Sequence, residues 1–86
     1  MKHAGAATLA VLSPLLDDVR KAAGAALVER KPGTFYRRGS AFLHFHEDAA
    51  GTFADLKVAG EWQRMAVDGR SGQTQLLRWL KAQLRG

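Results

Sequence analysis

The stretch that decides the fold is TFYRRGSAFLHFHEDAAGTFADLKVAGEWQRMAV, residues 34–67. Apolar and polar residues alternate along most of it, with many aromatic and β-branched side chains, which is typical of half-buried β-strands. Gly39-Ser40 suits a two-residue hairpin turn, and Asp48-Ala49-Ala50-Gly51 and Ala59-Gly60 suit two further turns. This pattern predicts four antiparallel strands, at 34–38, 41–46, 53–58 and 61–67.

Helical patterns flank this meander on both sides. Ser13 followed by Pro14 predicts a helix start, because a hydroxyl can cap free backbone amides and the fixed φ of proline suits the first helical position. The apolar stripe that follows predicts a helix over 14–30. After the meander, leucines spaced three and four apart predict a second helix over 71–85. Residues 1–12 have no comparable start signal, and we expect a flexible arm or a short turn of helix there.

The order of these elements predicts an α+β fold of two layers. Both helices would cover one face of a four-stranded antiparallel meander, in the order α-β-β-β-β-α. A chain of 86 residues is sized for one such core and has no room for a second. Residues 1–86 are therefore interpreted as a single domain.

Composition excludes several classes of protein. Hydrophobic residues make up 47% of the chain and charged residues 24%, which is near the globular average and speaks against wholesale disorder. The absence of cysteine excludes disulfides, thiolate-bound metals and thiol nucleophiles. The longest apolar stretch, 4–16, is too short to cross a bilayer, and the charges after it do not suit a signal-peptide cleavage site. We therefore predict a cytoplasmic protein with no membrane contact, export being the alternative.

Side-chain parity in the meander decides which residues share a face. The predicted turns set three cross-strand pairs: Arg38 with Ala41, Glu47 with Thr52, and Val58 with Glu61. One face is then apolar, and we predict that it forms the core beneath the helices with these residues: Tyr36, Ala41, Leu43, Phe45, Ala54, Leu56, Val58 and Met65.

The opposite face is predicted to be open to solvent and to combine aromatic with charged side chains. Its predicted members are Phe35, Arg37, Phe42, His44, Asp55, Lys57, Trp62 and Arg64. A shift of one residue at Ala59-Gly60-Glu61 would move the last two away. The unshifted register is preferred because it places Asp55 opposite Arg64 and Lys57 opposite Trp62, which are favourable pairs.

Such a face predicts a binding surface. The first interpretation is contact with another protein or with a second copy of the chain as a homodimer, because exposed sheet aromatics often form such contacts. The alternative is single-stranded nucleic acid, whose bases would stack on rings while cations meet the phosphates. The rings would be Phe35, Phe42 and Trp62, and the cations Arg37, Lys57 and Arg64. The net charge of +5 permits this partner without identifying it.

The run His44-Phe45-His46-Glu47-Asp48 suggests chemistry. Histidines two apart on a strand point the same way, and two imidazoles with a carboxylate can hold zinc, nickel or iron. A metal or small-ligand site around His44 and His46 is therefore a third alternative. The simpler interpretation is that His44 pairs with Asp55 across the sheet. We predict no resident cofactor or metal.

The row His44, Asp55 and Arg64 could support acid–base chemistry, in which the carboxylate orients the imidazole. However, a flat sheet face offers little concavity for a substrate. No nucleophile elbow, phosphate-binding glycine loop or dinucleotide fingerprint accompanies the row. We therefore predict a non-catalytic binding module.

The runs GTFYRR (33–38) and FLHFHED (42–48), with ADLK (54–57), carry a resemblance to short bacterial proteins of unassigned function. That resemblance implies no activity. The order of elements is more distantly similar to that of MmcQ/YjbR-like proteins, and this similarity implies a nucleic-acid partner. The chain lacks their additional helices and shares no motif with them.

Overall fold

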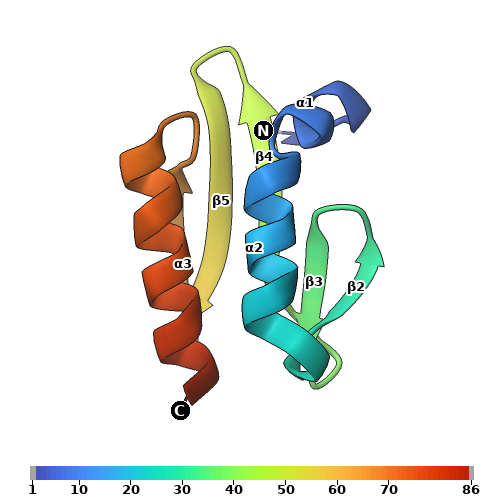
Figure 1. Ribbon diagram of the computed structural model, residues 1–86, viewed down its shortest axis with the longest axis vertical. Helices are drawn as coiled ribbons and strands as arrows, with labels where there is room; N and C mark the ends of the chain where they lie inside the picture. The colour runs from blue at the N-terminus through green and yellow to red at the C-terminus, as the bar shows by residue number, and fades with distance from the viewer. Residues whose placement is uncertain (1, 86) are drawn as a thin grey trace.

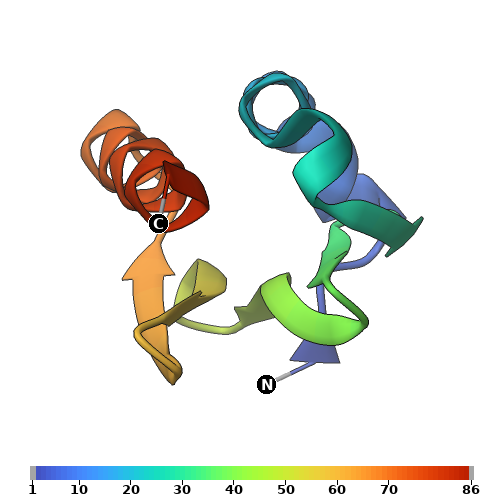
Figure 2. The same ribbon diagram turned by 90° about the horizontal axis from the view of Figure 1, so that it is seen from below.

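The computed structural model describes residues 2–85 (Figure 1). Its elements, in chain order, are β1 (Lys2–His3), α1 (Ala6–Val11), α2 (Ser13–Ala23), the 3₁₀ turn η1 (Gly24–Ala26), β2 (Val28–Lys31), β3 (Thr34–Arg37), β4 (Ser40–Asp48), β5 (Gly51–Val58), β6 (Glu61–Ala66) and α3 (Arg70–Arg85). The antiparallel sheet has the order β2-β3-β4-β5-β6, and β1 pairs with β4. Seen along the molecule, α2 and α3 lie on the same side of this sheet (Figure 2).

The predicted α+β class and antiparallel sheet are confirmed, but the count of four strands is wrong. The predicted helix over 14–30 ends at Ala23, because Gly24 adopts φ 52° and ψ −130°, a conformation that no helix continues through. The residues that follow form η1 and then β2, in which Val28 pairs with Tyr36 and Glu29 with Phe35. Ser13 makes no side-chain cap at the start of α2.

Residues 2–12 are ordered as β1 and α1 rather than as an arm. β4 is nine residues long, and β3 pairs with it only as far as His44. The part of β4 left over forms pairs with β1, namely Lys2 with Glu47 and His3 with His46. The backbone N–H of Ala4 then donates to the carbonyl of Phe45 at 3.0 Å. Unpaired backbone groups at the end of a long strand thus hold the N-terminal segment in place.

The registers of the two later hairpins agree with the prediction, whereas that of the first hairpin is wrong. Arg37 pairs with Ser40, so the turn is Arg38-Gly39 and not Gly39-Ser40. Both turn residues have positive φ, 52° and 81°, as a type I′ hairpin requires. The ladder also shifts by one residue between Phe35 and Tyr36, so β4 accommodates one extra residue, Phe42, in a β-bulge.

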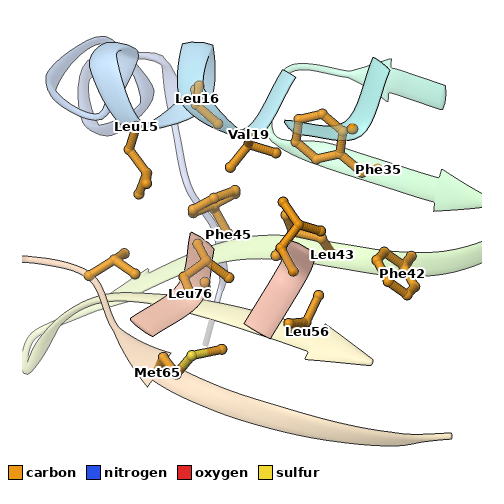
Figure 3. Close-up of a cluster of buried hydrophobic side chains, with 14 of the residues drawn as sticks. Leu15, Leu16, Val19, Phe35, Phe42, Leu43, Phe45, Leu56, Met65 and Leu76 are labelled. Carbon is orange, nitrogen blue, oxygen red and sulfur yellow. The ribbon is translucent and has the colours of Figure 1, made fainter. Parts of the chain in front are cut away.

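The bulge changes which side chains enter the core. Phe35 is 2% exposed and Phe42 6% exposed, and both belong to the buried cluster between sheet and helices (Figure 3). Tyr36 and Ala41, which were predicted to be core, are only half-buried and lie outside that cluster. The other predicted core residues are buried or, for Val58, packed against the cluster. The prediction of Phe35 and Phe42 on the open face is therefore wrong.

The helices complete this core with leucines. Leu15, Leu16 and Val19 of α2 and Leu76 and Leu80 of α3 are buried against the sheet. α3 begins in close contact with the end of β6, and a Cβ at Gly72 would overlap the carbonyl oxygen of Ala66. Among the described helices, none has both the length and the apolar character that a bilayer crossing needs.

Candidate functional site

The open face of the sheet has a central row formed by His44, Asp55 and Arg64. The strand registers place His44 opposite Asp55 and Asp55 opposite Arg64, as predicted. The Arg64 guanidinium donates through Nε to Asp55 Oδ1 at 2.8 Å and through Nη2 to Oδ2 at 2.9 Å. This bidentate pair satisfies a carboxylate that is only 7% exposed.

Asp55 is a charged residue whose side chain is largely buried. Burial alone would raise the pKa of Asp55, but the hydrogen bonds and charge of Arg64, with a contribution from His46, hold that pKa below its usual value. The same pairing raises the pKa of Arg64. Asp55 is therefore a carboxylate at neutral pH, able to orient a neighbouring imidazole.

Trp62 and Lys57 lie together on this face, also as the register predicted. The Lys57 Nζ lies 4.6 Å from the centroid of the Trp62 ring, a cation–π contact. Trp62 is 43% exposed, which makes it one of the few large apolar side chains at the surface of the described residues. These two residues remain accessible to a partner.

Three predicted members of the face lie elsewhere. Phe35 and Phe42 are in the core. Arg37 turns toward the helices, where its Nη1 donates to the carbonyl of Gln83 in α3 at 3.2 Å and its guanidinium lies 5.5 Å from the centroid of the Phe42 ring. Two of the three predicted stacking rings and one of the three cations therefore cannot meet a ligand on the open face.

A third histidine, missed in the sequence, joins the two that were singled out. β1 places His3 beside His46, with 4.9 Å between ring centroids. The His44 centroid lies 5.8 Å from that of His3 and 5.7 Å from that of His46. All three histidines of the chain thus form one cluster. The signal that could have found it is the length of β4, whose end was left without a partner.

Two ring nitrogens of the cluster, one in His44 and one in His46, lack a hydrogen-bond partner among the described residues. His44 Nε2 is buried and has no hydrogen-bond partner among the described residues. His46 Nδ1 lies 2.8 Å from Asp55 Oδ2, close enough for an electrostatic contact, but it lacks the alignment of a hydrogen bond. Burial, followed by the neighbouring His46 and His3, lowers the pKa of His44. Burial, Lys31 and His46 lower the pKa of His3. These two imidazoles are therefore neutral at pH 7 and can accept or coordinate.

A hollow of about 420 Å³ opens over this row, lined by His44, His46, Asp55, Trp62 and Arg64. The His44 and Trp62 rings stand 5.0 Å apart between centroids. As the side chains stand, no three His, Asp or Glu donors within residues 2–85 converge on a point that could hold a metal ion. The arrangement can bind through imidazole nitrogens, an indole face and a lysine.

Comparison of the chain with protein-family models, with curated proteins and with solved structures gave no match in any of the three.

Proposed function

We propose that the chain is a small non-catalytic binding module that associates with a second copy of itself along strand β6 and the adjoining open face. The observation that carries this proposal is the exposure of β6. Every residue of this edge strand except Met65 is exposed, and these exposed residues include Trp62. Unpaired edges are templates for pairing with another strand.

The opposite edge of the sheet is protected. β2 has only four residues and its ladder is interrupted between Glu29 and Lys31, and both features discourage pairing. β6 has six residues and an uninterrupted ladder with β5. The contrast supports β6 as the edge that binds.

The hydrogen-bond pattern tells which groups of β6 are free. The Val67 N–H donates to the Thr52 carbonyl at 2.9 Å, in step with the β5–β6 register. Because bonding directions alternate along an antiparallel strand, the backbone groups of Trp62, Arg64 and Ala66 point away from β5. These residues would donate to and accept from a second β6.

A twofold axis at Gln63 would use these groups best. It would pair Trp62 with Arg64 of the second copy, twice, on the same face of a continuous sheet, and a guanidinium against an indole is favourable. An axis at Arg64 would instead place two guanidinium groups opposite each other. The Gln63 register is therefore the one we propose.

The test uses like charges at the axis, measured by sedimentation equilibrium. The wild type should dimerise, whereas Gln63→Glu and Gln63→Lys should each be monomeric because two equal charges would face each other. An equimolar mixture of the two variants should dimerise again. Gln75→Glu, the same exchange on the exposed surface of α3, is the matched control and should behave as wild type.

Two results would reject the proposal. One is a wild type that remains monomeric at millimolar concentration, and the other is a mixture of the charged variants that stays monomeric while the wild type dimerises. If a fluorescent single-stranded oligonucleotide bound the monomeric wild type at low salt and Trp62→Ala abolished the binding, the nucleic-acid alternative would take its place. That alternative has less support, because Phe35, Phe42 and Arg37 do not reach the open face.

A further inference from the structure

We infer that His3, His44 and His46 form a binding site for a divalent transition metal of the zinc type, completed by the N-terminal strand β1. The inference does not depend on self-association. It starts from the position of the three imidazoles, which come from two strands and lie on the same side of the sheet.

The ring separations fit a shared metal. In a tetrahedral zinc site the nitrogens lie about 2.0–2.1 Å from the metal, so ring centroids are about 3.2 Å from it and about 5 Å from one another. The three observed separations are 4.9, 5.7 and 5.8 Å. The donors do not yet converge. Metal binding would require the three rings to rotate until their nitrogens converge.

Two of the three rings have nitrogens that gain from such a rotation. His44 Nε2 is buried with no partner, which costs free energy that a metal bond would recover. His46 Nδ1 lies 2.8 Å from Asp55 Oδ2 without alignment. A small turn of this ring would direct its Nδ1–H at the carboxylate and leave Nε2 for the metal.

Asp55 would then act as a positioning residue. Metal-binding histidines usually donate their second N–H to a carboxylate or carbonyl, which fixes the tautomer and the orientation of the ring. Asp55 is itself held by two hydrogen bonds from Arg64. The chain therefore has a support for one ligand already in place, which an incidental group of surface histidines would lack.

The donor set selects the class of metal. Three imidazoles suit zinc, cobalt, nickel and copper ions rather than magnesium or calcium, which prefer oxygen. A fourth position would face the hollow beside Trp62. Lys31, which lies close enough to act on His3, opposes a cation, so we expect weaker binding than at a closed structural zinc site.

The test is calorimetric titration of the full chain with Zn²⁺ alone. The wild type should bind one equivalent, and His3→Gln should raise Kd at least ten-fold. His3 is exposed on a two-residue strand, so its loss should leave the fold intact. Lys2→Gln, in the same strand, is the matched control and should keep the wild-type Kd. His44→Gln and His46→Gln should also weaken binding, and Asp55→Asn should do so by about ten-fold.

A second readout reports coordination directly. Co²⁺ bound by three imidazoles should give visible absorption bands that His3→Gln changes and Lys2→Gln does not. A wild type with no saturable Zn²⁺ binding, or a Kd that is the same in His3→Gln, would overturn the inference. Repeating the titration on Gln63→Glu separates it from self-association, because the metal site should persist in a monomer.

Discussion

The β3–β4 and β5–β6 hairpins have the same type of turn, but their hydrogen-bonded ladders differ. Arg38-Gly39 and Ala59-Gly60 both have positive φ at the two turn residues, the type I′ geometry. The β5–β6 ladder then runs without interruption, and Trp62 stays on the open face. The β3–β4 ladder contains a bulge, and Phe42 is buried. A single extra residue in a strand can thus separate two rings that simple alternation would place on the same face.

The largest expected effect contrasts these two rings. Phe42→Ala should lower the free energy of unfolding by about 3–4 kcal/mol, because it leaves a cavity in the core. Trp62→Ala should lower it by about 1 kcal/mol, since the ring is 43% exposed and rests on Lys57 and His44. Urea unfolding followed by circular dichroism measures both. Equal losses would show that the two rings are buried to the same extent, which would contradict the β-bulge at Phe42.

A smaller loss of unfolding free energy is expected when the type I′ turn of either hairpin is changed. Gly39 and Gly60 have φ of 81° and 83°, and a Cβ at either would meet no other atom within 4 Å. Gly39→Ala and Gly60→Ala should therefore each lower the free energy of unfolding by about 1–2 kcal/mol, because alanine is strained in the left-handed conformation. Thermal unfolding compares them, with Gly69→Ala as the control in open space at ordinary φ. A cost at Gly60 but none at Gly39 would mean that the first hairpin uses a different turn.

The smallest expected effect lies beside the β3–β4 hairpin, at Glu29 in β2. Its carboxylate accepts from Arg20 Nε at 2.7 Å and Nη2 at 2.8 Å, and from the Gly33 N–H at 3.0 Å. The hydrogen bond from Arg20, against an opposing effect of burial, holds the pKa of Glu29 below its ordinary value of 4.5. Because Arg20 is partly exposed, Glu29→Gln should lower the free energy of unfolding by only about 1 kcal/mol at pH 7.

The pH dependence of that cost follows from the direction of the shift. The unfolded state binds the proton more readily than the folded state, so the stabilisation is present in full above pH 4.5 and is lost as the pH falls through the lower folded value. Unfolding free energies of wild type and Glu29→Gln should therefore differ at pH 7 and converge in acid. A difference that is unchanged in acid would point to packing rather than charge.

Local pattern predicted much of the sheet. Alternation and glycine turns located β3, β4, β5 and β6. The favourable pairs Asp55 with Arg64 and Lys57 with Trp62 selected the correct register for β5 and β6. β2 was not predicted, because Ala26 and Leu27 continue the helical spacing of α2 in the sequence, although Gly24 ends the helix in the structure. β1 was not predicted because two residues carry no periodicity.

The candidate site was predicted in part for the same reason. His44 and His46 follow from alternation along one strand, whereas His3 is 41 positions before His44 and no local pattern connects them. The pairing depends on β4 extending beyond β3, which depends on where the first hairpin turns. The misplaced turn of that hairpin, together with the bulge that was not predicted, also misplaced Phe35, Phe42 and Arg37.

The amino-acid order alone determined the class of fold, the antiparallel meander and the charged row on its open face, because these depend on neighbours two to four residues apart or on adjacent hairpins. Only the tertiary structure decided which rings are buried and that three histidines meet. The burial of the rings depends on the β-bulge at Phe42, and the histidine cluster depends on β1 pairing with the end of β4. Both depend on contacts between residues that are distant in the sequence.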